Sequence, residues 1–227
     1  MKLNSKFEVE IKRTNRQKTA SLKVNEGHVQ VIVPKLLSDK EIETLILKKT
    51  RWIKDKLRVQ ELAPSYKPKE FISGESFSYL GKNYRLKVLK GNKVSVKLKE
   101  GRFFVTTKSK DRSCRALLEK WFREKALQRL TEKTIRYAES MQVKPSKISV
   151  REYRSRWGSC SPKDHISYNW KIIMAPSSVI DYVVVHELSH LKHRDHSIKY
   201  WKTVEANFPA YKDRRAWLKK NANLLKW

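Results

Sequence analysis

Residues 186–196 read HELSHLKHRDH and hold four of the six histidines in the chain. Within this stretch, residues 186–190 form the pattern HExxH, of which about 0.01 matches are expected by chance at this composition. On an α-helix, His186 and His190 are one turn apart, offset by about 40° around the axis and about 6 Å along it. Both imidazoles can then meet one metal ion at about 2.0–2.1 Å. The spacing therefore predicts a metal site.

Glu187 follows the first histidine and lies at the edge of the apolar stripe of the same helix. At about 100° per residue, the stripe is formed by residues such as Val184 and Leu188. Burial of a carboxylate costs free energy unless a cation faces it. In a purely structural helix Leu or Ala would fill this position. A metal ion beside Glu187 would account for the carboxylate.

A protein-bound zinc ion with an open position for water needs a third protein ligand, and four residues are candidates. His193 shares the helix face only if the helix continues, and Asp195 is better suited to cap the next helix. His196 follows a polar stretch where the chain can turn back, and Glu205 lies one helix later. We favour His196, with Glu205 as the alternative. Imidazole ligands favour zinc, one per chain, by geometry and availability.

The elements that must position this site follow from about residue 111. The sequence predicts one long amphipathic helix before Pro145, two strands joined by a turn-rich link, and three further helices. The predicted long helix covers 114–141, the strands cover 147–153 and 166–174, and the later helices begin near Pro176, Ser197 and Pro209. The HExxH residues fall in the helix that follows Pro176.

The preceding residues are rich in predicted strands. Seven runs with alternating apolar and polar residues are separated by turn signals. They cover 7–13, 20–24, 28–34, 75–80, 84–90, 93–99 and 102–107. One helix, 38–57, opens on a capping box formed by Ser38 and Glu41. We therefore expect an α/β (α+β) protein with a β-rich part at 1–110 and a second part at 111–227.

Composition limits the class of protein. The 227 residues are 39% hydrophobic and include seven tryptophans, which is typical of a folded chain rather than a disordered one. The N-terminus lacks the apolar run of a signal peptide, and no stretch approaches the eighteen apolar residues of a membrane span. The two cysteines form no CxxC pair, which fits a reducing compartment. We expect a cytoplasmic protein that does not enter a membrane.

The formal net charge of +29 is extreme and is spread along the chain. One interpretation is a solvated, lysine-rich surface. The other is attraction to a polyanion such as nucleic acid or a nucleotide. No basic run in the sequence is interleaved with aromatic residues in the manner of a base-stacking platform. Both interpretations remain open at this point.

The stretch HELSHLKHRDHSIKYW resembles the HELxHxxxxxHSxxFW signature of the YgjP-like metal-dependent hydrolases. It is also similar to the SprT-like and WLM zinc proteases. Upstream, RWGSC, NW and DYVVVHEL continue the resemblance, whose detailed part covers about residues 150–220. The resemblance implies that His186, His190 and His196 bind the metal and that Glu187 is catalytic. It also implies a compact zincin-like core of the minigluzincin type within 111–227.

The expected function is that of a zinc-dependent hydrolase, in first place a metallopeptidase acting on a peptide or protein. Glu187 would serve as general base toward a metal-activated water. Arg156, in RSRWGSC, either contacts substrate oxygens or belongs to a tight turn at Gly158 with Trp157 packed beneath it. Two alternatives are a metal-dependent phosphohydrolase of nucleoside triphosphates and a nucleic-acid-associated protein with a structural metal site.

Overall fold

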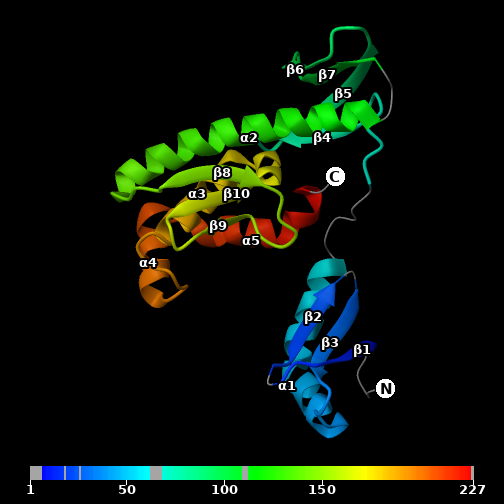
Figure 1. The fold of residues 1–227 in the computed structure, drawn as a ribbon, viewed down its shortest axis with the longest axis vertical. Helices are drawn as coiled ribbons and strands as arrows, with labels where there is room; N and C mark the ends of the chain where they lie inside the picture. Colours follow the sequence, from blue (N-terminus) through cyan, green and yellow to red (C-terminus); the bar gives the residue numbers. More distant parts are fainter. Residues whose placement is uncertain (1–6, 18, 26, 62–67, 109–111, 226–227) are drawn as a thin grey trace. The chain divides into compact units, whose positions relative to one another are not determined.

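The computed structural model describes residues 7–17, 19–25, 27–61, 68–108 and 112–225. It divides into two compact units, Met1–Pro64 and Ser65–Trp227. We call them the N-terminal unit and the C-terminal unit, and both are drawn in Figure 1. Each unit has its own hydrophobic core.

The N-terminal unit is a three-stranded sheet with one helix. Its elements are β1 (Val9–Thr14), β2 (Ser21–Asn25), β3 (His28–Pro34) and α1 (Asp39–Glu61). The strand order is β1-β3-β2, with β3 parallel to β1 and antiparallel to β2. The predicted capping box is confirmed, because the Ser38 N–H donates to Glu41 Oε2 at 2.9 Å and the Glu41 N–H donates to Ser38 Oγ at 3.4 Å.

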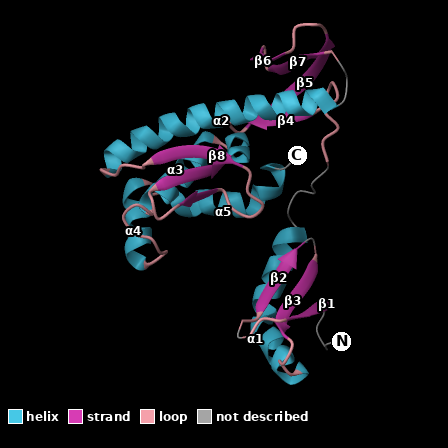
Figure 2. Ribbon diagram, viewed as in Figure 1, coloured by secondary structure: helices cyan, strands magenta, loops and turns pink. Residues whose placement is uncertain are grey.

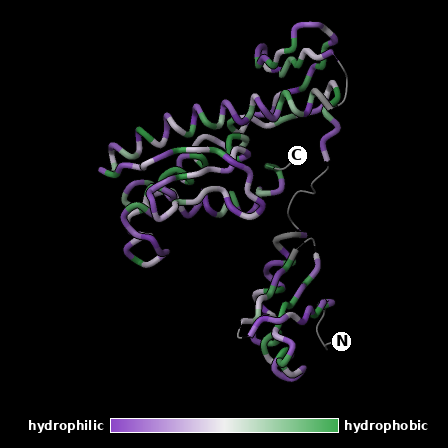
Figure 3. The backbone as a smooth tube through the Cα atoms, viewed as in Figure 1, coloured by the Kyte–Doolittle hydropathy of each residue, from purple (hydrophilic) through white to green (hydrophobic). Residues whose placement is uncertain are grey.

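The C-terminal unit begins with a four-stranded sheet that packs on a long helix. The strands are β4 (Ser76–Tyr79), β5 (Lys82–Lys90), β6 (Ser95–Lys99) and β7 (Arg102–Thr107), in the order β4-β5-β7-β6. The helix is α2 (Arg112–Met141). Alternation along β7 buries Phe103 and Val105 toward α2, which buries Leu118 and Phe122 in return. Hydrophobic residues recur along α2 in Figure 3, as its amphipathic pattern requires.

The remaining elements pack on the other side of α2. They are β8 (Lys147–Arg151), β9 (Gly158–Cys160), β10 (His165–Asn169), η1 (Trp170–Met174), α3 (Ser177–Ser189), α4 (Ile198–Asn207), α5 (Tyr211–Asn221) and η2 (Ala222–Leu225). In Figures 1 and 2, β5, β6 and β7 are drawn on one side of α2 and β8, β9 and β10 on the other. In the second sheet β10 is central, parallel to β8 and antiparallel to β9. The mixed α/β class is confirmed.

Two details of the predicted elements differ from the structure. The strand predicted over 166–174 ends at Asn169, and residues 170–174 form the 3₁₀ helix η1. The Asn169 side chain causes this change, because its Oδ1 accepts from the Lys171 N–H at 3.2 Å and caps the helix. Strand β9 was predicted only as a link, since three residues are too short for a periodic signal.

The division between the two compact units, at 64/65, differs from the boundary near residue 110 that the sequence predicts. The boundary predicted near residue 110 falls on residues 109–111, which lie outside the described residues. The β4–β7 sheet belongs to the C-terminal unit because its apolar face is covered by α2. Among the described residues, no helix combines the length and the apolar character needed to cross a membrane.

Candidate metal centre

Helix α3 positions the first part of the site. It is the most completely buried helix of the C-terminal unit, with Val179, Ile180, Val184 and Leu188 at 0–1% exposure. It ends at Ser189, and His190 occupies the C-cap with its N–H donating to the Glu187 carbonyl at 3.2 Å. His190 is therefore fixed at the point where the chain leaves the helix.

Three histidines meet at this end of α3. One nitrogen each from His186, His190 and His196 lies within 4.8 Å of the other two. The Nε2 atoms of His186 and His196 are 3.4 Å apart. Ten residues of chain separate this pair, so the turn after α3 brings His196 back to the helix. The arrangement can hold one divalent metal ion with three imidazole ligands.

Polar contacts fix the turn between His190 and His196 at two places. The His193 carbonyl lies 3.1 Å from Nδ1 of His190, where it accepts a hydrogen bond if that nitrogen carries the proton. Nε2 of His190 is then left as the metal-binding nitrogen. Arg194 donates through Nη1 to the Ser161 carbonyl at 3.0 Å and pairs through Nη2 with Asp164. The ligand turn is thereby attached to the β9–β10 turn.

The other candidates for the third ligand lie elsewhere. Helix α3 has ended before His193, which contributes its carbonyl to the turn. Asp195 Oδ1 accepts from the Ser197 N–H at 3.2 Å, at the start of α4. Glu205 pairs with Lys212 at 3.3 Å on the exposed side of α4. Of the four candidates, only His196 is brought to His186 and His190.

The chemistry of the donor set fits a metal ion. Burial lowers the pKa of His186 to about 3, and the neighbouring histidines and Arg215 add to the effect. Burial also lowers the pKa of His190. Both rings are therefore neutral near pH 7, with lone pairs free to coordinate. Nδ1 of His186 is buried without a hydrogen-bond partner in the described part of the chain. Two neutral imidazoles that share one space with a third histidine ring fit a bound cation.

Glu187 directly follows His186 in α3, and its side chain is buried. Its exposure is 4%, and burial raises the pKa of its carboxyl to about 8, while Arg156 acts in the opposite direction. The carboxyl is not among the three ligand groups of the histidine cluster. A buried carboxyl with a raised pKa is suited to accept and return a proton near neutral pH.

Gly158 explains how Glu187 fits against the small sheet. A Cβ placed on Gly158 would lie 2.6 Å from Cγ and 2.7 Å from Cδ of Glu187. The glycine opens β9 and pairs with Tyr168, so the predicted tight turn at this position is wrong. Glycine is required here because the glutamate side chain occupies the space that a Cβ would fill.

Two aromatic residues were missed as parts of the site. Tyr200 is fully buried, stacks on the His190 ring at 4.6 Å between centroids, and donates its hydroxyl to the His186 carbonyl at 2.9 Å. Trp201 stacks on the His196 ring at 5.7 Å between centroids. These rings hold the histidine side chains in place. The available signal was the aromatic pair YW, four and five residues after His196.

Arg156 is exposed and stands near the site. Its guanidinium carbon lies 5.7 Å from the ring centre of Tyr153, and its charge acts on the Glu187 carboxyl. Its carbonyl accepts from the Asn169 side chain at 3.3 Å. The position is compatible with a contact to substrate, and that role remains a prediction.

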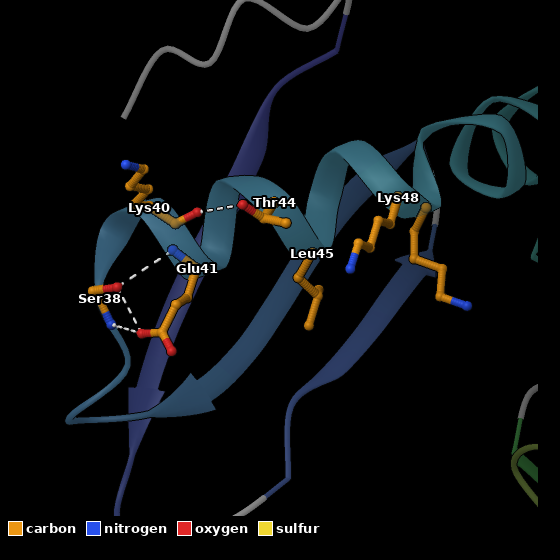
Figure 4. A pocket seen from close by; sticks show the side chains of 7 residues that line it. Ser38, Lys40, Glu41, Thr44, Leu45 and Lys48 are labelled. Carbon is orange, nitrogen blue, oxygen red and sulfur yellow. Dashed lines mark hydrogen bonds between the residues drawn. The ribbon is translucent and has the colours of Figure 1, made fainter.

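A separate hollow lies on the N-terminal unit and contains none of these residues. Figure 4 shows it along α1, beside the capping box. Its lining consists of Ser38, Lys40, Glu41, Thr44, Leu45, Lys48 and Lys49. Glu41 is engaged by Ser38, and no metal-ligating group of residues gathers there within the described chain. The hollow therefore offers no catalytic constellation.

Comparison with known proteins identifies one family. The family model described as YgjP-like, metallopeptidase domain, matches residues 18–221. No curated protein matches the chain. Among solved structures, the metallopeptidase zymogen of Methanocaldococcus jannaschii jannalysin is 18% identical, with 39% of this chain and 92% of that chain covered and a TM-score of 0.36. The zymogen of Pyrococcus abyssi abylysin is 19% identical, with coverages of 40% and 97% and a TM-score of 0.35.

Proposed function

The chain belongs to the YgjP-like metallopeptidase domain family, and from this premise we propose that it is a zinc-dependent peptidase in which Glu187 is the general base. The observation that carries the proposal is the position of the Glu187 carboxyl. It is buried, it directly follows His186 in α3, and it is not one of the three groups that can share one ion. A structural metal site has no need of such a carboxyl.

In this proposal His186, His190 and His196 hold one zinc ion. The His193 carbonyl orients the His190 ring, and Tyr200 and Trp201 pack against the imidazoles. When bound, the ion supplies Lewis-acid chemistry, polarising a carbonyl oxygen and lowering the pKa of water. Three imidazoles favour zinc over oxygen-seeking ions such as magnesium.

Glu187 moves the proton. Its carboxyl has a pKa raised by burial, and the positive charge of a nearby cation would lower that pKa toward the working range. As a carboxylate it takes a proton from the attacking water. It then returns the proton to the leaving nitrogen of the substrate. The buried location excludes bulk water, which would otherwise exchange that proton.

An extended peptide suits the surroundings of Glu187. Strand β9 lies at the edge of its sheet, in the order β8-β10-β9, and its first residue touches the Glu187 side chain. A peptide can add to such an edge through main-chain hydrogen bonds. This would carry a scissile bond along β9 past the carboxyl, so the edge strand favours a peptide over a nucleotide as substrate.

The test compares the purified wild-type protein with Glu187→Gln. Casein and a nucleoside triphosphate serve as substrates, with zinc content and melting temperature measured in parallel. The variant keeps the side-chain shape and removes the base, so peptide hydrolysis should fall at least 10²-fold while zinc content stays the same. Glu205→Ala is the matched control, because Glu205 is an exposed glutamate paired with Lys212 away from the histidines.

Activity that survives Glu187→Gln within a few-fold would show that the chemistry lies elsewhere in the molecule. The wild-type protein could instead hydrolyse the triphosphate and not casein. If Glu187→Gln then lost that activity, the assignment of Glu187 would stand and the substrate would be a nucleotide rather than a peptide. The two substrates thus separate an error about the residue from an error about the reaction.

A further inference from the structure

The β4–β7 sheet has a second face, directed away from α2, that gathers positive charge. Alternation along the strands places five cations on this face, none of them buried. They are Arg85 and Lys87 on β5, Lys97 and Lys99 on β6, and Arg102 on β7. None of the four strands contains Asp or Glu. We call this surface the basic sheet face.

An aromatic ring lies at the centre of the basic sheet face. Phe104 on β7 is partly exposed, and its cross-strand partners are Lys87 on β5 and Lys97 on β6. The Nζ atoms of Lys99 and Lys87 lie 5.1 and 5.9 Å from the centre of its ring. The pairing of the strands therefore places an aromatic residue between lysines, although no such alternation is visible along the sequence.

These cations have few partners within the protein. Among the described residues, only Lys99 of the five forms an ion pair, with the exposed Glu100 at 3.5 Å. The other four cations have no carboxylate partner there, and exposed cations of this kind are complementary to phosphates. The ring itself supplies a flat apolar surface on which a base can stack.

We propose that the basic sheet face binds single-stranded nucleic acid, with Phe104 stacking on a base and the surrounding lysines and arginines contacting phosphates. A single strand fits better than a duplex, because only unpaired bases expose their faces to an aromatic side chain. An acidic protein would use the charge but has no group that requires the ring. Strands β5, β6 and β7 lie across α2 from α3, which carries His186, and no histidine of the metal cluster belongs to the basic sheet face, so this proposal is independent of the peptidase proposal.

The test measures binding by fluorescence anisotropy with the full chain. The probes are labelled oligo(dT) and oligo(U) of about 20 nucleotides, and the same dT strand paired with oligo(dA). Salt is varied between roughly 50 and 200 mM. Single strands should bind more tightly than the duplex, and affinity should fall with salt by a slope of about 0.7 per phosphate contact. The two labelled single strands distinguish DNA from RNA.

Two kinds of variant locate the site. The double variant Lys87→Glu, Lys97→Glu should weaken binding at least tenfold and reduce the salt slope by about 1.4. The double variant Lys219→Glu, Lys220→Glu is the matched control, since it changes the net charge equally at exposed positions of α5. Phe104→Ala should weaken single-strand binding roughly 5- to 100-fold, whereas Phe104→Trp should retain it. Circular dichroism checks that each variant is folded.

The proposal is overturned if the control variant weakens binding as much as the sheet variant, because net charge alone would then be responsible. It is also overturned if folded Phe104→Ala and Phe104→Leu bind like wild type, or if duplex and single strands bind equally. If the protein bound anionic vesicles or an acidic peptide but no single strand, the basic sheet face would bind a partner other than nucleic acid, and the proposal would be wrong.

Discussion

The two sides of α2 use charge in opposite ways. On one side, Glu187 is buried against Gly158, and Tyr200 and Trp201 pack against the neighbouring histidine rings. On the other side, five cations stand exposed around Phe104 with almost no partners. A buried charge needs a fixed companion, so its surroundings are specific and costly to change. Exposed charges are stabilised by water and are readily replaced.

The largest expected effect concerns the histidines. Each of His186→Ala, His190→Ala and His196→Ala removes one of three imidazoles, and a two-ligand site binds zinc far more weakly. Purified variants should lose most of their zinc, as measured by atomic emission, while wild type carries about one ion per chain. His193→Ala is the matched control, because its contribution to the turn is the backbone carbonyl, and it should keep its zinc.

Full zinc occupancy in His196→Ala would show that His196 is not a zinc ligand. The site would then need another residue as its third ligand, and the contrast drawn above between the two sides of α2 would name the wrong histidine. Loss of zinc in Glu205→Ala would point to the alternative ligand weighed from the sequence.

The next effect concerns Gly158. Gly158→Ala places a methyl group against Cγ and Cδ of Glu187 and must displace the carboxyl. A displacement of about 1 Å can cost 10²-fold in rate, so hydrolysis should fall roughly 10- to 100-fold. Zinc content should change little. Overpacking should also lower stability by about 1–3 kcal/mol, measured by chemical denaturation.

Removing the glutamate side chain provides a matched background for Gly158. In Glu187→Ala the added methyl group meets no carboxyl, so Gly158→Ala should then cost much less stability. An equal cost in both backgrounds would mean that Gly158 serves the backbone of β9 rather than the position of Glu187.

Sequence reasoning located the histidine site because its main residues are close in the chain. HExxH lies within one helix, and His196 follows a single turn, so local periodicity is sufficient to bring them together. Gly158 was misinterpreted because its neighbour Glu187 is 29 positions away in the sequence and meets it only through the packing of α3 on β9. The contacts of Tyr200 and Trp201 with the histidines were missed because helical periodicity predicts which residues are buried, not which side chains they touch.

The basic sheet face could not be predicted from the chain at all. Lys87, Lys97 and Phe104 belong to three different strands, and they are neighbours only because β7 lies between β5 and β6. The individual strands were predicted from alternation, but strand order depends on pairing between distant segments. A pattern in one strand carries no information on which charges its neighbours present.

The third effect is a pH dependence of stability in the zinc-free protein. Burial raises the pKa of Glu187 from 4.5 to about 8, so the folded state binds a proton that the unfolded state releases between these values. Stability therefore falls as pH rises through this range, by up to about 1.4 kcal/mol per pH unit. His186, with its pKa lowered to about 3, acts the other way below pH 6.5. His190, whose pKa is also lowered, acts in the same direction as His186, so the contribution of the glutamate is isolated by a variant that lacks only this carboxyl.

The measurement is urea denaturation in the presence of a chelator, with Glu187→Gln as the matched variant. The amide does not titrate, so the difference in unfolding free energy between the two proteins should change with pH and favour the variant more at pH 8. A pH-independent difference would show that the carboxyl is already ionised in the folded protein, and hence less buried than the structure indicates.

The smallest effect concerns the exposed cations. Lys97 lies on the basic sheet face with no ion pair among the described residues, and Lys87 is close by across Phe104. Lys97→Gln removes mutual repulsion in water, so at low salt it should stabilise the protein by no more than about 0.5 kcal/mol. At about 1 M salt the Debye length is about 3 Å and the gain in stability should vanish.

Lys219→Gln on α5 is the comparison for a lysine outside the face, and thermal denaturation at both salt concentrations measures the difference. A change of several kcal/mol in Lys97→Gln, or one that persists at high salt, would mean that this lysine is held as firmly as the buried glutamate, and the contrast between the two sides of α2 would fail.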